Sequence, residues 1–169
     1  MRTIDNINDL NKSDFLSIFG NVFEKTESVA LETFELKPFK DFNDINLKML
    51  NIYEAYEKDK ILEILNSHPE LAVAKKLTSE SKSEQASAKL NECSNDEYEE
   101  FKKLNLEYKK KFNFPFIIAV KGKNKNEILN NFRQRIQSDV EIEFLEAKKQ
   151  VKKIATFRLN EISNKWKNL

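Results

Sequence analysis

The chain has 169 residues, of which 40% are hydrophobic and 34% are charged, and its formal net charge is +1. This size and an apolar content that includes 13 Phe suit one domain with a hydrophobic core, which we expect to span residues 1–169. With only two Gly and three Pro the chain has little turn material, which argues against a many-stranded β-sandwich and favours helices joined by short loops.

In the first half of the chain, apolar residues repeat with the period of a helix in four stretches. These stretches cover residues 13–19, 28–35, 44–56 and 61–67. Gly20 follows the first stretch and Pro38 closes the second, because neither residue continues a helix well. The residue before a proline avoids the helical region, so His68, which precedes Pro69, is predicted to lie just past the end of the fourth helix.

The second half of the chain contains four further helical patterns and one irregular segment. The helices are expected over residues 79–90, 94–112, 124–136 and 138–164. Three of them start at a capping-box pattern, in which Ser or Asn is followed three residues later by Glu. Residues 114–120 instead form a continuous apolar run, and Pro115 makes this run an extended, buried connector. We therefore predict an all-α fold: a single compact domain of about eight helices with one buried extended connector.

Residue counts argue against several kinds of site and location. The single cysteine, Cys93, forms no intramolecular disulfide, and one histidine with one cysteine does not build a typical zinc site. The two glycines are isolated, so no phosphate-binding loop is expected. No apolar run approaches the roughly 18 residues of a membrane span, and the polar residues 5–14 do not resemble a signal peptide. We expect a cytoplasmic protein with neither a metal nor a membrane partner.

Charge is distributed unevenly along the chain. The first 108 residues carry an excess of acidic side chains, and the last 61 carry an excess of basic ones. The basic residues are mostly Lys scattered through helical patterns without aromatic neighbours, which argues against nucleic-acid binding. Pairing of oppositely charged faces between two copies of the chain is at least as consistent with this distribution.

Arg158 interrupts the apolar stripe of the last predicted helix. It lies four residues after Ile154 and four before Ile162, so its side chain is expected to face the core. A buried guanidinium is costly unless it is paired. Arg158 is therefore a structural residue bonded to buried acceptors, an arginine that extends to the surface, or an anion-binding residue inside a pocket.

His68 and a short helical face are the other candidates for chemistry. His68 is the single histidine, and its imidazole suits either proton transfer near neutral pH or capping of the preceding helix. Ser81, Glu84 and Gln85 lie on one face of the helix over 79–90, which is either a solvated or a binding surface. Glu84 and His68 would form an acid–base pair if they meet, which the sequence does not show.

Four segments, in this order, resemble the 2-oxo-4-hydroxy-4-carboxy-5-ureidoimidazoline (OHCU) decarboxylase family. They are Ser67–Ala72, Leu77–Ala86, Leu104–Ile117 and Ile154–Leu159, which resemble the family's HPDLA, LTxESxxEQ, LNxxYxxxFGFPFI and IAxxRL motifs. Weaker likeness over Phe19–Glu24 extends the resemblance to nearly the whole chain. Asn113 and Lys89 stand where the family commonly has Gly, Glu27 stands where an aromatic residue is common, and the stretch after Ala72 is shorter than usual.

The resemblance implies an all-helical, cofactor-free enzyme, usually a homodimer, that converts OHCU to (S)-allantoin in urate breakdown. It implies that His68 is the catalytic acid or base, with Glu84 beside it. The substrate-binding residues that it implies are Ser81, Gln85 and Arg158 through their side chains, and Pro69, Phe116, Ile117, Ile118, Ala119 and Val120 as pocket lining. One pocket would then explain the arginine in the apolar stripe, the single histidine and the polar helical face.

The chemistry of this reaction suits such a site. The substrate's own ring accepts the electrons left by the departing carbon dioxide, so no metal or organic cofactor is required. The protein has to orient the ring, hold the carboxylate and protonate one face, and an Arg fork and a His–Glu pair suit these tasks. Two alternatives stay open: a related enzyme acting on another ureido or carboxylated imidazole ring, and a non-catalytic helical interaction module.

Overall fold

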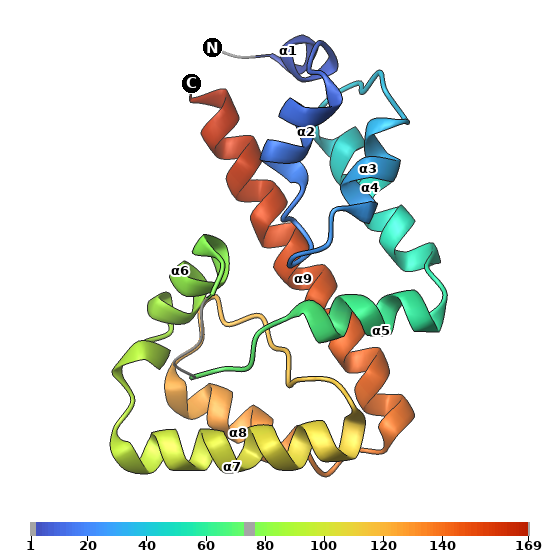
Figure 1. The fold of residues 1–169 in the computed structure, drawn as a ribbon. Helices are drawn as coiled ribbons and strands as arrows, with labels where there is room; N and C mark the ends of the chain where they lie inside the picture. Colours follow the sequence, from blue (N-terminus) through green and yellow to red (C-terminus); the bar gives the residue numbers. More distant parts are fainter. Residues whose placement is uncertain (1–2, 73–76, 169) are drawn as a thin grey trace. The chain divides into compact units, whose positions relative to one another are not determined.

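The computed structural model describes residues 3–72 and 77–168, and within these ranges the chain is helical and contains no strand (Figure 1). The all-α prediction is therefore confirmed. The helices are α1 (Ile4–Asn8), α2 (Lys12–Phe19), α3 (Ser28–Phe34), α4 (Phe42–Ala55), α5 (Lys58–Ser67), α6 (Ser79–Ser87), the 3-10 helix η1 (Leu90–Glu92), α7 (Asn95–Phe112), α8 (Lys125–Arg135) and α9 (Val140–Lys167).

Most predicted helix boundaries agree with the structure to within a few residues. Because α5 ends at Ser67, His68 lies just past the helix end as predicted. The expected helix over 79–90 is divided into α6 and η1, since Lys89 between them adopts a left-handed backbone conformation with φ 58°. The short helix α1 is not indicated by the apolar pattern, because only Ile4 and Ile7 of its five residues are apolar.

The chain divides into two compact units. The first comprises Met1–Ser67 and Lys152–Leu169, and the second comprises His68–Val151. Helix α9 contributes to both, because its residues up to Val151 belong to the second unit and the following ones to the first. The expectation that residues 1–169 form one domain stays a prediction.

Aromatic rings form much of the core of the first unit. Phe15 of α2 contacts three other rings at centroid distances between 4.6 and 5.9 Å; these rings belong to Phe19, Phe34 and Phe39. Phe23, in the segment after α2, stacks on Tyr53 of α4 at 4.7 Å. Helices α3 and α4 lie side by side (Figure 1). The apolar faces predicted from the sequence thus meet as helix-on-helix layers.

The second unit is built around the connector, residues 114–120. Phe116 of the connector stacks on Phe132 of α8 at 3.9 Å and meets Tyr108 of α7 edge-on at 5.4 Å. Helices α7 and α8 lie side by side in Figure 1. All seven residues of the connector are buried, and residues 115–120 belong to no helix or strand. The predicted burial of this connector, and its position outside the helices, are therefore confirmed.

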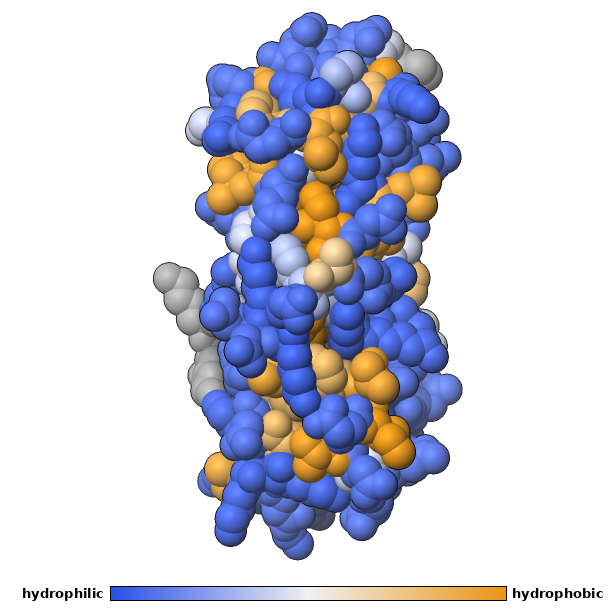
Figure 2. All heavy atoms as spheres, turned by 90° about the vertical axis from the view of Figure 1, so that its right-hand side faces the viewer, coloured by the Kyte–Doolittle hydropathy of each residue, from blue (hydrophilic) through white to orange (hydrophobic). Residues whose placement is uncertain are grey.

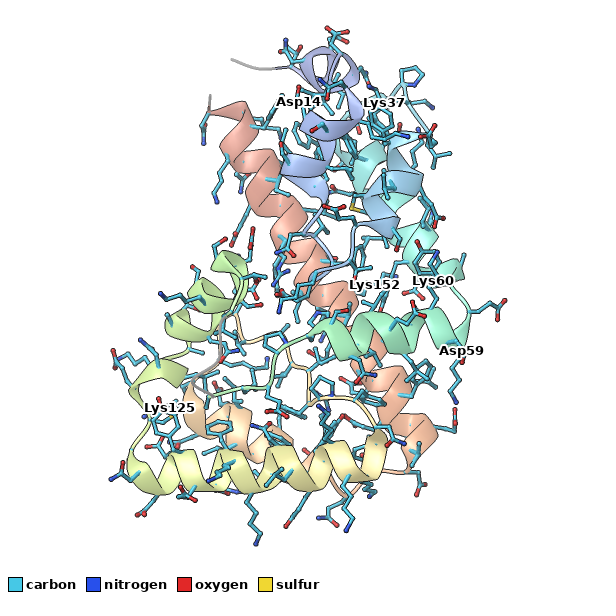
Figure 3. All side chains as sticks on the ribbon, viewed as in Figure 1. Asp14, Lys37, Asp59, Lys60, Lys125 and Lys152 are labelled. Carbon is cyan, nitrogen blue, oxygen red and sulfur yellow. The ribbon has the colours of Figure 1, made fainter. Side chains whose placement is uncertain are left out.

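The surface is mainly polar. Figure 2 shows one face on which hydrophilic residues predominate and hydrophobic residues form separate patches. In the second unit, Lys125 at the start of α8 (Figure 3) pairs with the Glu97 carboxylate of α7 at 3.0 Å and donates to the Glu92 carbonyl oxygen at 3.1 Å. Across the parts of the chain that the structure describes, no helix combines the length and the apolar character that a membrane crossing requires.

The end of α7 provides a test of the backbone geometry. Asn113 follows the helix in the left-handed conformation, with φ 63°. A side chain in this region costs roughly 1–2 kcal/mol, and Asn tolerates it better than most residues. Asn113→Ala should therefore lower the free energy of unfolding by about 1 kcal/mol, while Asn113→Gly should leave it equal or slightly higher. Urea denaturation measures both, with the exposed Lys110→Ala as a control, and an equal loss in both Asn113 variants would contradict the prediction.

Candidate active site

His68 lies at the start of the second unit, directly after the last turn of α5. Its side chain is buried, with 8% of its surface exposed. Pro69 follows it and is partly exposed. The proline prevents continuation of the helix, so the imidazole is carried by an irregular segment, residues 68–72, that has to be fixed by other parts of the unit.

Two side-chain amides hold this segment. Gln85 of α6 accepts a hydrogen bond from the Ala72 backbone N–H at 3.2 Å and donates to the Glu70 carbonyl oxygen at 3.4 Å. Asn105 of α7 donates to the Leu71 carbonyl oxygen at 3.0 Å. Ala72 adopts a positive φ of 52°, a conformation that a non-glycine residue needs surrounding contacts to maintain. The amides therefore fix the backbone that follows His68.

The predicted polar face of α6 belongs to the same unit as His68. Ser81 and Gln85 are buried, with 5% and 7% of their surface exposed, and Glu84 is partly exposed. Thr78 caps this helix by accepting from the Ser81 backbone N–H at 3.2 Å. The face is therefore buried at two of its three polar positions, which is inconsistent with a purely solvated surface.

The connector is held by two side chains that are not among the predicted site residues. Arg135 of α8 donates from Nη1 to the Ile117 carbonyl oxygen at 2.8 Å. Gln150 of α9 accepts from the Ala119 backbone N–H at 3.0 Å. Arg135 lies seven residues after Ile128 and three after Phe132, in the apolar stripe of α8. The criterion that singled out Arg158 would therefore also have found Arg135.

Arg135 is part of a buried polar network. Its Nε and Nη2 atoms bind the Glu143 carboxylate of α9 at 2.9 and 2.6 Å, and the Tyr108 hydroxyl of α7 donates to the same carboxylate. Burial and this bond to the Glu143 carboxylate raise the pKa of the Tyr108 hydroxyl far above its usual range. The phenol therefore stays protonated at any physiological pH and acts as a fixed hydrogen-bond donor.

Ile118 lies between these two fixed points of the connector. It is buried, and among the residues that the structure describes neither its backbone N–H nor its C=O is hydrogen-bonded to the protein. Buried backbone groups are almost always paired, because an unpaired one carries its full desolvation cost. The second unit thus contains a donor and an acceptor in adjacent positions that a bound molecule could satisfy.

Arg158 belongs to the first unit, where it is paired. Only 4% of its surface is exposed, and its Nη2 binds the fully buried Glu24 carboxylate at 2.8 Å while its Nη1 donates to the Asn21 carbonyl oxygen at 2.9 Å. The core-facing position predicted for Arg158 is confirmed, and the buried acceptors of its structural interpretation are present. Whether it also binds an anion stays a prediction. Glu24 was not selected from the sequence, although it lies in a stretch that resembles the family.

Other chemistry is not favoured by the described residues. Within residues 3–72 and 77–168, no group of three or more His, Cys, Asp and Glu side chains could hold a metal ion. Burial and the nearby Glu97 charge raise the pKa of the Cys93 thiol, which makes it a poor nucleophile. His68, the polar face of α6 and the connector all belong to the second unit, and they stay the candidates for a reactive site there.

Comparison with known proteins places these features in a family context. The OHCU decarboxylase family profile matches residues 8–160. The chain is 35% identical over 161 residues to the 2-oxo-4-hydroxy-4-carboxy-5-ureidoimidazoline decarboxylase of Halalkalicoccus jeotgali, covering 95% of this chain and 92% of that protein. It is similar to the crystal structure of (S)-allantoin synthase, with a TM-score of 0.76 and 26% identity, covering 96% of this chain and 54% of that one.

A longer relative shows the same likeness over part of its length. The chain is 37% identical over 168 residues to a uric acid degradation bifunctional protein of Bacillus sp. (strain TB-90). The alignment covers 99% of this chain and 34% of that protein. The chain therefore spans about a third of the length of this bifunctional relative.

Because the Arg158–Glu24 pair is buried, removing its carboxylate should lower the free energy of unfolding far more than removing a carboxylate at the surface. Glu24→Gln leaves the Arg158 guanidinium buried without its counter-charge, and the free energy of unfolding should fall by about 3–5 kcal/mol. Glu32→Gln is the matched control, because Glu32 pairs with Lys60 (Figure 3) at 3.0 Å on the surface of the same unit. Its loss should stay below about 1 kcal/mol. Similar losses in both variants, measured by urea denaturation, would contradict the importance of burial.

Proposed function

This chain belongs to the OHCU decarboxylase family, and from that premise we propose that it converts OHCU to (S)-allantoin in the degradation of uric acid. The observation that carries the proposal is the family match over residues 8–160, which includes the segment bearing His68, the polar face of α6 and the connector. The names of the relatives support both the reaction and the pathway, since they are uric acid degradation proteins, OHCU decarboxylases and an (S)-allantoin synthase.

The reaction breaks the bond between a ring carbon and the carboxylate. Carbon dioxide leaves, the electron pair passes into the adjacent imine of the substrate's own ring, and a proton then returns to one face. His68, with Glu84 beside it, is the residue pair proposed to hold and deliver that proton, because imidazole gains and loses a proton near neutral pH. A buried imidazole on a fixed segment would deliver the proton from one side only, which would give one enantiomer.

Substrate binding is proposed to use both side chains and backbone. The ring and the ureido group of OHCU carry adjacent N–H and C=O groups. These match the N–H and C=O of Ile118, which have no partner among the described residues. Pro69 and the connector residues Phe116, Ile117, Ala119 and Val120 complete the lining in this proposal. Ser81 would bond the substrate directly, while Gln85 would contribute at least through the segment that its amide holds.

Arg158 enters the proposal through the family resemblance alone, because it lies in the other unit. A guanidinium presents donors that match a carboxylate or ureido oxygen. Its ion pair with Glu24 would hold the side chain in one orientation before the substrate arrives. In this role Glu24 would position Arg158 and would not contact the substrate.

The working form of the protein is also part of the proposal. The enzyme would need neither a metal nor an organic cofactor, because the substrate ring accepts the electrons of the broken bond. The single cysteine suits a reducing, cytoplasmic location, and the uneven charge along the chain suits a homodimer. No nucleic-acid or membrane partner is proposed.

Two departures from the family pattern have a backbone explanation. Lys89 and Asn113 stand where the resemblance leads us to expect Gly, and both have a positive φ, 58° and 63°. Glycine is favoured there because it lacks a Cβ, so these substitutions affect backbone strain and not the polar groups of the site. They therefore give no support to a different ring as substrate. The shortened stretch after Ala72 falls on residues 73–76, outside the described residues.

The proposed role of His68 predicts a large loss of activity in His68→Asn. Loss of an acid–base group typically costs a factor of about 10² to 10⁴ in rate, while an amide of similar size should leave the melting temperature close to that of the unchanged protein. OHCU is generated from urate with urate oxidase and hydroxyisourate hydrolase, and the circular dichroism of allantoin is followed. Activity within a few-fold of the unchanged protein would contradict the assignment of His68.

The unchanged protein also tests the two alternatives. Faster appearance of the allantoin dichroic signal than in the spontaneous reaction supports OHCU decarboxylation. Turnover of another carboxylated or ureido-substituted imidazole ring with inert OHCU would indicate the related enzyme. No turnover, together with no rise in melting temperature with allantoin, would indicate a helical interaction module.

A further inference from the structure

We propose that Arg135 and Gln150 are positioning residues for decarboxylation, which clamp the connector backbone so that Ile118 keeps its N–H and C=O available to the substrate. This inference rests on the proposed function, because it concerns the same reaction. Neither residue is among those proposed to contact the substrate. Both belong to the second unit, together with the connector and His68.

Stability of the unit does not by itself account for the contacts that Arg135 makes. Its guanidinium joins the Glu143 carboxylate to the Ile117 carbonyl oxygen and lies 4.4 Å from the centroid of the Phe116 ring. Replacing a buried ion pair by apolar residues of similar volume is often neutral or stabilising, so burial alone gives no reason for these charges. A rigid fork that reaches a carboxylate and a backbone carbonyl together does fix the geometry of the connector.

Gln150 supplies the second point of the clamp. Its Oε1 accepts from the Ala119 N–H, and its Nε2 donates to the Glu146 carboxylate at 2.7 Å. Because a carboxylate only accepts, Glu146 orients the amide so that the oxygen faces the connector. Gln150 is buried, with 7% of its surface exposed, so water does not compete freely for this bond.

The two fixed points leave one residue between them. In a trans peptide unit the C=O and the N–H point in opposite directions. The Ile117 C=O shares such a unit with the Ile118 N–H, and the Ala119 N–H shares one with the Ile118 C=O. The bonds to Ile117 and Ala119 therefore direct the N–H and C=O of Ile118 away from Arg135 and Gln150. Rotation of the connector would exchange these sides and bury the substrate-binding groups of Ile118 against the helices.

The test uses Arg135→Lys and Gln150→Leu in the full chain. Lysine keeps a positive charge beside Glu143 but loses the fork, and leucine keeps the volume of Gln150 but loses the acceptor. Each should lower kcat/KM for OHCU by about tenfold to a hundredfold, because small displacements of binding groups cost rates of this order. Arg133→Lys is the matched control, since Arg133 lies on the same helix and makes a two-point bond to Glu100 on the surface. It should stay within twofold.

Amide hydrogen exchange of residues 117–119 supplies a readout that is independent of activity. Both variants should exchange at least tenfold faster at Ala119, whereas the control Arg133→Lys, whose surface bonds do not reach the connector, should retain slow exchange. Unchanged exchange in Arg135→Lys and Gln150→Leu would overturn the clamp. Faster exchange with kcat/KM within twofold of the unchanged protein would overturn its role in the reaction.

Failure of the proposed function would look different. If the unchanged protein does not accelerate OHCU decay, the reaction and the catalytic part of this inference both fall. The exchange rates of the variants then still decide whether Arg135 and Gln150 fix the connector.

Discussion

Each unit of this protein contains a buried arginine whose guanidinium binds both a carboxylate and the backbone carbonyl of an irregular segment. In the first unit Arg158 binds Glu24 and the Asn21 carbonyl oxygen, and in the second Arg135 binds Glu143 and the Ile117 carbonyl oxygen. A buried guanidinium is stable only when its donors are satisfied. Each arginine therefore fixes the position of its irregular segment against the helix that carries the arginine.

Neutral amides perform the same task at several other places. Gln85 and Asn105 bind the backbone after His68, Gln150 binds the connector, and Asn8 binds both the N–H and the C=O of Phe39. Helices satisfy their own backbone groups, but irregular segments do not, and the described residues contain no sheet that could supply partners. Side chains on neighbouring helices therefore supply the hydrogen bonds that an adjacent strand would supply in a sheet.

This arrangement suits a site made of irregular segments. The two segments proposed to contact the substrate, residues 68–72 and 116–120, are each anchored to helices by side-chain hydrogen bonds. Anchored backbone loses little freedom when a ligand binds, which favours accurate placement of the reacting atoms. The left-handed conformations of Ala72, Lys89 and Asn113 belong to the same second unit, where the chain changes direction between helices.

The sequence by itself determined the local features of this protein. The helical period, the caps at Ser94 and Asn124, the break before Pro69 and the apolar connector depend on residues within a few positions of one another, so they follow from the order of the amino acids. The sequence also placed Arg158 in the core. Only the tertiary structure decided what each buried polar group binds. The partners of Arg158 lie 134 and 137 residues away, and the connector N–H that Gln150 binds lies 31 residues away. No local rule predicts contacts over such separations.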